Sequence, residues 1–105
     1  MSEELQVQLK KGVLELCVLS LLSRGDSYAY EIASKLTNGI GMGEGTIYPL
    51  MRRMQADGLV KTYLEESSSG PPRKYYQLTT KGKAQLAELN EYWKYINATI
   101  SQLGR

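Results

Sequence analysis

Apolar residues recur at helical spacing through the first half of the chain, and the pattern predicts two successive helices. The first covers residues 9–23 and ends at Arg24-Gly25-Asp26. Its broad apolar face consists of Val13, Leu14, Cys17, Val18, Leu21 and Leu22. The second runs to Leu36, with Ser27 expected as its N-cap. Its inward positions are Ala29, Ile32, Ala33 and Leu36. Residues 38–43, rich in glycine, are predicted to form a flexible turn.

A third helix and a β-hairpin follow. The helix is predicted over 44–56, with Ile47, Leu50, Met51 and Met54 on its inner face and Asp57-Gly58 as its end. Residues 59–65 are rich in β-branched and aromatic side chains and predict a strand. Residues 66–72, with three serines, one glycine and two prolines, predict a seven-residue loop, and 73–78 predict the returning strand.

The last 25 residues predict one long helix with an apolar seam. Thr79 suits its N-cap, and the helix is expected to reach about Leu103. The seam positions alternate between gaps of three and four residues: Leu86, Leu89, Trp93, Ile96, Ile100 and Leu103. A chain of 105 residues buries only a modest core, so this helix is expected to pack against a partner. We therefore predict a dimer interface along the seam.

Composition excludes several classes of function. The chain has no histidine and a single cysteine, Cys17, so zinc, haem and histidine-based catalytic sites are not expected. Cys17 lies in an apolar run, where a thiol is usually a small core residue. No paired carboxylates or nucleophile–base set stands at a defined spacing. We expect no enzyme, no cofactor, no metal, no membrane segment and a cytoplasmic location.

Positive charge gathers in one part of the chain. The net charge is only +2. Between Thr46 and Lys83, however, the sequence has seven basic residues and only three acidic ones. Such a local basic surface is what contact with nucleic-acid phosphates requires.

The outer face of the third helix combines residue types that suit the DNA major groove. At about 100° per residue it carries Gly45, Tyr48, Pro49, Arg52 and Arg53, with Thr46 nearby. A small residue permits close approach, Tyr48 and Thr46 can donate hydrogen bonds, and Arg52 can reach guanine or phosphate. A solvated face with ordinary arginines is the alternative, and for Arg53 alone the two readings are even. Arg73 and Lys74 beside the predicted loop favour DNA contact.

Three motifs resemble those of PadR-like transcriptional regulators. They are 25–32 (GDSYAYEI), 45–60 (GTIYPLMRRMQADGLV) and 72–82 (PRKYYQLTTKG). The resemblance covers nearly the whole chain. It implies a winged helix-turn-helix and a homodimer on a palindromic operator, usually as a repressor. The single C-terminal helix resembles the short branch of the family, which dimerises through that helix and the first one.

Trp93, at the middle of the seam, suggests a ligand site. On the first helix Leu9, Gly12 and Leu16 share a separate face, and Gly12 leaves space in mid-helix. Together with Leu89, Trp93 and Asn97 they could form an apolar slot for a planar aromatic effector at the dimer interface, where a symmetric dimer would bring two copies of Trp93 together. A role for Trp93 in the dimer core alone is the competing interpretation. Short PadR-like proteins that sense drugs resemble this chain in the position of the tryptophan.

These observations predict a mainly α protein with a small β-hairpin (α+β). We expect a winged helix-turn-helix over 1–79 and a dimerisation helix over 80–105. The expected function is DNA-binding transcriptional regulation, most simply as a homodimeric repressor on a palindromic operator. Release by a planar hydrophobic effector is expected if the slot exists. The alternative is a winged-helix protein-interaction module that does not bind DNA.

Overall fold

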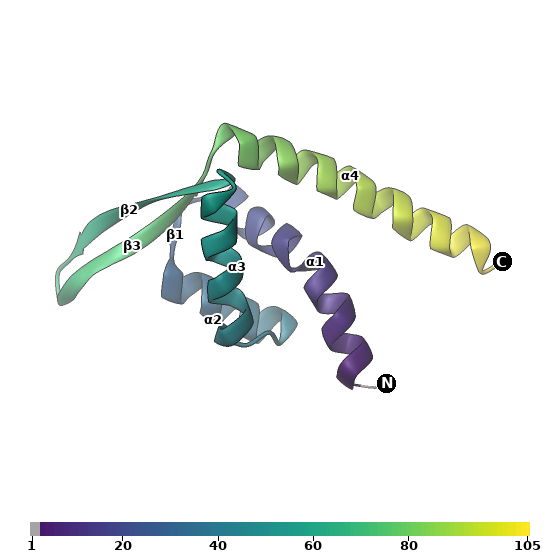
Figure 1. The fold of residues 1–105 in the computed structure, drawn as a ribbon, viewed down its shortest axis with the longest axis horizontal. Helices are drawn as coiled ribbons and strands as arrows, with labels where there is room; N and C mark the ends of the chain where they lie inside the picture. Colours follow the sequence, from purple (N-terminus) through teal and green to yellow (C-terminus); the bar gives the residue numbers. More distant parts are fainter. Residues whose placement is uncertain (1–2) are drawn as a thin grey trace.

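The computed structural model describes residues 3–105, and of Glu3 and Gly12 only the backbone. The elements follow in the order α1 (Glu3–Ser23), β1 (Ser27–Tyr28), α2 (Ala29–Ile40), α3 (Glu44–Ala56), β2 (Val60–Ser67), β3 (Gly70–Leu78) and α4 (Thr80–Leu103). The predicted α+β order of three helices, a hairpin and a long last helix is confirmed. The hairpin leaves the α1–α3 bundle at one end, and α4 runs to the other (Figure 1).

The core lies between α1, α2, α3 and the base of the hairpin. The first three helices contribute the inward residues that their periodicity predicts, although Val13, Cys17, Leu21 and Ala29 are only partly buried. Leu19 of α1 is fully buried, which the predicted face of that helix omitted. Because α1 contacts both α2 and α4, its apolar surface is wider than one stripe. Its N-terminal end also extends six residues beyond the predicted start at Leu9.

The predicted start of α2 is wrong. Ser27 is buried in β1 and pairs with Tyr76 of β3, so its backbone belongs to a sheet. The N-cap is Tyr28, which makes no capping hydrogen bond through its side chain. At the other end α2 continues to Ile40, so the predicted turn over 38–43 is too long. Gly41, with a φ of 74°, caps the helix, and the Thr37 hydroxyl donates to the Met42 carbonyl at 2.9 Å.

The predicted seven-residue loop of the hairpin is also wrong. β2 and β3 pair from Val60↔Leu78 to Ser67↔Gly70, which leaves only Ser68 and Ser69 in the turn. A β-bulge lies between Glu65 and Ser67. The sheet order is β1-β3-β2, and β1 covers β3 only at Tyr75 and Tyr76. Pro71 and Pro72 lie opposite the bulge, where the ladder with β2 is interrupted and β1 does not cover the other edge of β3.

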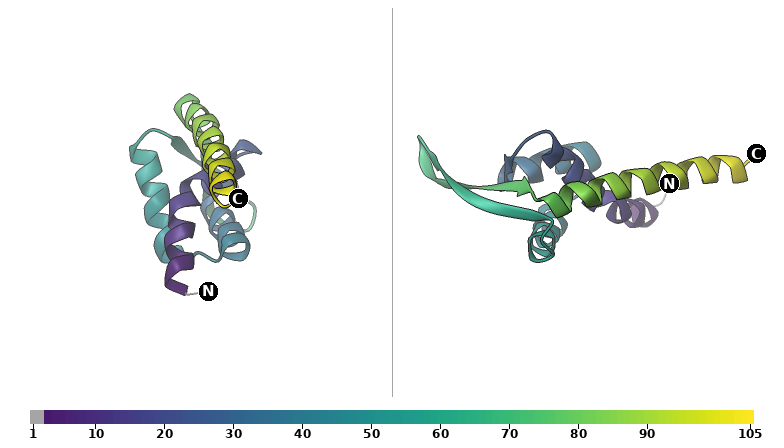
Figure 2. Two further views of the ribbon diagram at one scale, coloured as in Figure 1. Left: turned by 90° about the vertical axis from the view of Figure 1, so that its right-hand side faces the viewer. Right: turned by 90° about the horizontal axis from the view of Figure 1, so that it is seen from above.

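The joint between hairpin and α4 is tightly built. Thr79 is the N-cap of α4 as predicted, and its hydroxyl accepts from the Gly82 N–H at 3.0 Å. The same hydroxyl donates to the Gly58 carbonyl at 2.6 Å, and Lys81 donates to the Asp57 carbonyl at 2.7 Å. These bonds fix the direction in which α4 leaves the sheet. Seen from above, hairpin and α4 extend to opposite ends of a molecule 56 Å long (Figure 2).

Among residues 3–105, no helix has the length and apolar content needed to cross a membrane.

Candidate nucleic-acid interface

α3 is held by one face and open on the other. Ile47, Leu50, Met51 and Met54 are all at most 8% exposed, as their spacing predicts. The opposite ridge, defined here by Gly45, Pro49 and Arg52, is exposed along the helix. A Cβ built at Gly45 would meet nothing within 4 Å, so packing does not require glycine there. The ridge is therefore an open surface that can approach a groove closely.

The remaining predicted residues of α3 flank this ridge on two sides. Thr46 and Arg53 face α1, where they line a groove of about 500 Å³ together with Lys11 and Glu15. Gly45 and Pro49 of the ridge form the outer lip of the same groove. Tyr48 lies on the hairpin side, and on that side the Gln55 amide donates to the Thr62 hydroxyl of β2 at 3.3 Å. The predicted six-residue face is thus a central ridge with two distinct flanks.

Tyr48 is less exposed to solvent than the residues of the ridge. It is half-buried and packs against the core cluster. Burial raises the pKa of its phenol, and the negative charge of Glu44 adds to the rise. Tyr48 therefore stays protonated at neutral pH and keeps its O–H as a hydrogen-bond donor.

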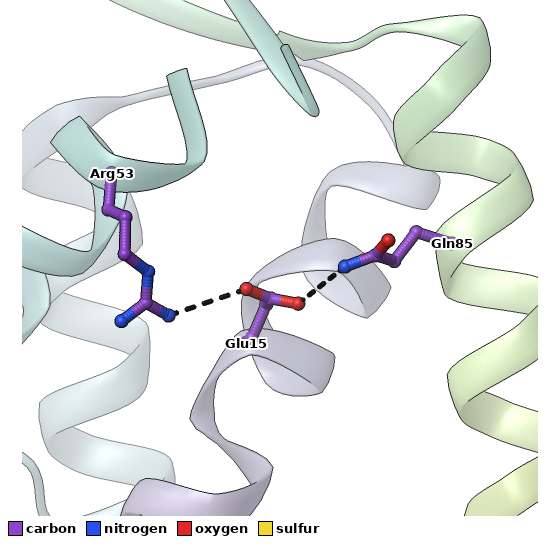
Figure 3. Close-up of polar contacts among 3 residues, drawn as sticks. All are labelled: Glu15, Arg53 and Gln85. Atoms are coloured by element: carbon purple, nitrogen blue, oxygen red, sulfur yellow. Dashed lines mark hydrogen bonds and ion pairs between the residues drawn. The ribbon is translucent and has the colours of Figure 1, made fainter. Parts of the chain in front are cut away.

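Glu15 of α1 contacts side chains of both α3 and α4. One carboxylate oxygen lies 3.4 Å from a guanidinium nitrogen of Arg53, and the other accepts from the Gln85 amide at 2.9 Å. Figure 3 shows the carboxylate between the two partners, which come from α3 and α4. The Arg53 side chain remains 62% exposed, whereas that of Glu15 is 23% exposed. Arg53 is therefore oriented toward α1 and is still open to solvent.

Arg73 and Lys74 of the hairpin do not form one patch. Successive residues of a strand point to opposite faces of the sheet. The Arg73 guanidinium lies 4.5 Å from the centre of the Tyr28 ring, and the Lys74 ammonium lies 5.4 Å from that of Tyr76. Each cation is exposed and rests on an aromatic ring. Both faces of the hairpin thus carry a positive charge.

A row of tyrosines anchors the hairpin to β1. Tyr75 of β3 lies between Tyr28 and Tyr63, with ring centres 5.6 Å apart in both pairs. The Tyr63 hydroxyl donates to the Asp26 carboxylate at 2.6 Å. This hydrogen bond, more than any other factor, raises the pKa of Tyr63 to about 12. The row ties both strands of the hairpin to β1 and to the turn after α1, which the sequence pattern did not predict.

A second groove lies between α1 and α4, with a volume of about 470 Å³. Four of the residues predicted for an effector slot, Leu9, Leu16, Leu89 and Trp93, line it. Asn97 is not among the lining residues, and Gly12 falls outside the described side chains. Its walls are mostly apolar: Val13, Tyr92 and Ile96 also line it, and Gln8 and Glu15 are its polar members. The predicted residues therefore meet around a concave surface within one protomer.

The apolar seam of α4 divides into two parts. Leu86 and Leu89 pack against the core of the same protomer. Further along, Trp93, Ile100 and Leu103 are 39%, 62% and 80% exposed, while Ile96 is partly buried. Large apolar side chains that are this exposed along one helix indicate a surface on which another helix can pack. The outer half of the seam is the part that this protomer leaves uncovered.

Sequence reasoning missed Lys11, Glu15 and Gln85. Lys11 and Glu15 precede and interrupt an apolar helical face, and Gln85 lies one position before the seam. An acidic residue inside an apolar run was the only signal available, because its partners are 38 and 70 positions away.

Known proteins of the same fold are numerous among solved structures. Residues 18–88 match the transcriptional regulator PadR-like family. A PadR-like transcriptional regulator from Bacillus cereus is 44% identical, with 91% of this chain and 95% of that chain covered and a TM-score of 0.83. A PadR-like transcription factor from Bacteroides fragilis is 41% identical, with 96% and 99% covered and a TM-score of 0.77. PadR of Bacillus subtilis, in complex with operator DNA, is 26% identical, with 73% and 46% covered and a TM-score of 0.65.

Proposed function

The chain belongs to the PadR-like family of transcriptional regulators, and from this premise we propose that it is a homodimeric repressor that reads a palindromic operator with α3. The observation that carries the proposal is the exposed ridge of Gly45, Pro49 and Arg52 on a helix whose opposite face is buried in the core. Arg52 would contact a base edge, and Tyr48 and Thr46 would donate hydrogen bonds beside it. The related PadR of Bacillus subtilis in complex with operator DNA supports this mode of action.

Phosphate contacts would come from the sides of the ridge. Arg53 lies in the groove beside α1, and Arg73 and Lys74 extend the positive charge onto the hairpin. In the proposal residues 1–79 form the DNA-binding unit, and the site of action is the cytoplasm, where bacterial chromosomal DNA lies. Because the net charge is only +2, non-specific attraction is weak and two copies must bind together.

Dimerisation is proposed through the helix of residues 80–105. The uncovered part of the seam, from Trp93 to Leu103, supplies an apolar surface at heptad spacing. The seam residues are Leu86, Leu89, Trp93, Ile96, Ile100 and Leu103. A second copy would cover the outer four, from Trp93 to Leu103, and hold two reading helices at the separation that a palindrome requires. Bound over a promoter, such a dimer would block transcription.

The groove between α1 and α4 is proposed to bind a planar aromatic effector. Trp93 and Leu16 are apolar walls against which a flat ring can stack. Saturable quenching of Trp93 fluorescence by planar aromatic compounds is the expected result, and Trp93 is the only tryptophan of the chain. No quenching across a diverse panel would refute this part of the proposal.

Electrophoretic retardation of the DNA upstream of the protein's own gene tests DNA binding. We expect the protein to bind that fragment more tightly than a shuffled fragment of equal length, and we expect the binding to weaken steeply as the salt concentration rises. A protein-interaction module that has kept the winged-helix shell is the second candidate, favoured by the weak net charge. That candidate would retain neither fragment.

A further inference from the structure

Glu15 is a charged residue at a place where burial makes charge costly. It lies in mid-α1, and its side chain is only 23% exposed. A carboxylate drawn partly out of water is destabilising unless hydrogen bonds and an opposite charge compensate it. Both carboxylate oxygens have partners, one in Arg53 of α3 and the other in Gln85 of α4. A simple solvated glutamate would not be shared between two other helices in this way.

Glu15 also lies where two grooves meet. It lines the apolar groove with Leu16 and Trp93, and it lines the groove of the reading helix with Thr46 and Arg53. Among the described residues it is the one side chain common to both linings. A change in the spacing of α1 and α4 therefore reaches Arg53 through this carboxylate.

Arg53 can keep this contact and still bind DNA. A guanidinium has five N–H groups in a fixed plane, and the contact with Glu15 engages one nitrogen. At 62% exposure the side chain remains accessible to a phosphate or base edge. Because the guanidinium is planar and rigid, an ion pair at one of its nitrogens restricts the direction in which its remaining N–H groups point.

We propose that Glu15 is a positioning residue for operator recognition, which orients Arg53 on the reading helix and couples that orientation to α4 through Gln85. This inference rests on the proposed function, because it requires that α3 binds DNA. It adds a residue outside the DNA-contacting set and a route by which the α1–α4 groove can influence binding.

The test compares Glu15→Gln with Glu91→Gln. Both changes remove one negative charge per protomer, but Glu91 is on the exposed face of α4 and pairs only with Lys94 at 3.8 Å. The readout is the ratio of affinities for the upstream fragment and the shuffled fragment, because a general electrostatic gain cancels in it. Glu15→Gln should lower the ratio about two- to fivefold per half-site, the range of a partly exposed ion pair. Glu91→Gln should leave the ratio unchanged.

The same pair of measurements in an Arg53→Ala background separates positioning from a general structural role. With Arg53 absent, Glu15→Gln should no longer lower the ratio. An equal loss in both backgrounds, or no loss in either, would overturn the proposal. Gln85→Ala should lower the ratio in the wild-type background, and an unchanged ratio would overturn the link to α4. Thermal unfolding identifies a variant that fails to fold, and Glu15→Asp, which keeps the charge, should then recover part of the ratio.

The two proposals fail differently. If the wild-type protein shows no preference for the upstream fragment, the proposed function is refuted and the role of Glu15 with it. If the wild type discriminates and Glu15→Gln discriminates equally well, only the role of Glu15 is refuted.

Discussion

Replacing Gly82 by alanine should destabilise the protein, although alanine is the better helix former. Gly82 lies in the first turn of α4 and is buried against the joint between α3 and β2. A Cβ at this position would overlap the Leu59 carbonyl oxygen and lie 3.1 Å from the carbonyl carbon and 3.2 Å from a Leu78 methyl. Backbone atoms cannot rotate away, so α4 would have to move by roughly 1 Å.

The magnitude follows from what such a movement breaks. The Leu59 carbonyl accepts from the Thr79 N–H at 3.1 Å, and the Thr79 hydroxyl donates to the neighbouring Gly58 carbonyl at 2.6 Å. Losing these bonds costs about 0.5–1.5 kcal/mol each, and losing the Thr79 cap costs about 1 kcal/mol. The gain in helix propensity returns at most about 1 kcal/mol. We therefore expect a net loss of about 1–3 kcal/mol in the free energy of unfolding.

Urea denaturation followed by circular dichroism measures this loss. Protein concentration must be the same for all variants, because a dimer gains stability with concentration. Gly39→Ala is the matched control, since Gly39 lies inside α2 and an added Cβ would meet nothing within 4 Å. That control should gain about 0.5–1 kcal/mol. A Gly82→Ala variant as stable as wild type, or more stable, would refute the packing argument.

Three further predictions concern Tyr63, Cys17 and the outer seam of α4. Tyr63, whose pKa is raised to about 12, should give a tyrosinate absorbance step near that pH, and Tyr63→Phe should remove that step. Because this pKa is higher than that of the unfolded chain, the stability that the phenol contributes is present below pH about 10 and lost as the pH rises through about 12; a difference between wild type and Tyr63→Phe that grew with pH would contradict this. Burial raises the pKa of the Cys17 thiol, so alkylation of the folded protein at neutral pH should be slower than that of the urea-unfolded chain, and equal rates would contradict its placement. Ile100→Gln combined with Leu103→Gln should shift sedimentation from dimer to monomer, whereas Lys94→Gln should not; a double variant that remained dimeric would remove the outer seam from the interface.

Periodicity predicted the helices well because each buries one face. Ile47, Leu50, Met51 and Met54 needed only their spacing to be placed in the core. The hairpin turn was mispredicted because serine, glycine and proline usually indicate loops. Pro71 and Pro72 are accommodated in β3 because the ladder with β2 is interrupted by the bulge and β1 does not reach the other edge, and local sequence contains neither fact.

The candidate site was predicted in its parts and not in its arrangement. The outer ridge of α3 followed from helical geometry. The division of Thr46, Arg53 and Tyr48 between two flanks depends on where α1 and the hairpin lie. The contacts of Glu15 with Arg53 and Gln85 join three helices, and no local pattern predicts such contacts.

The most direct test of the account is the effect of Arg52→Ala on DNA discrimination. Arg52 is exposed on the ridge of α3, and Arg24, an exposed arginine at the end of α1, is the matched control. Affinities for the upstream and shuffled fragments would be measured at one salt concentration. Arg52→Ala should cost about 1–3 kcal/mol on the upstream fragment and much less on the shuffled one, with Arg24→Ala changing neither. Equal losses on both fragments, or none on either, would contradict sequence reading by Arg52 of α3.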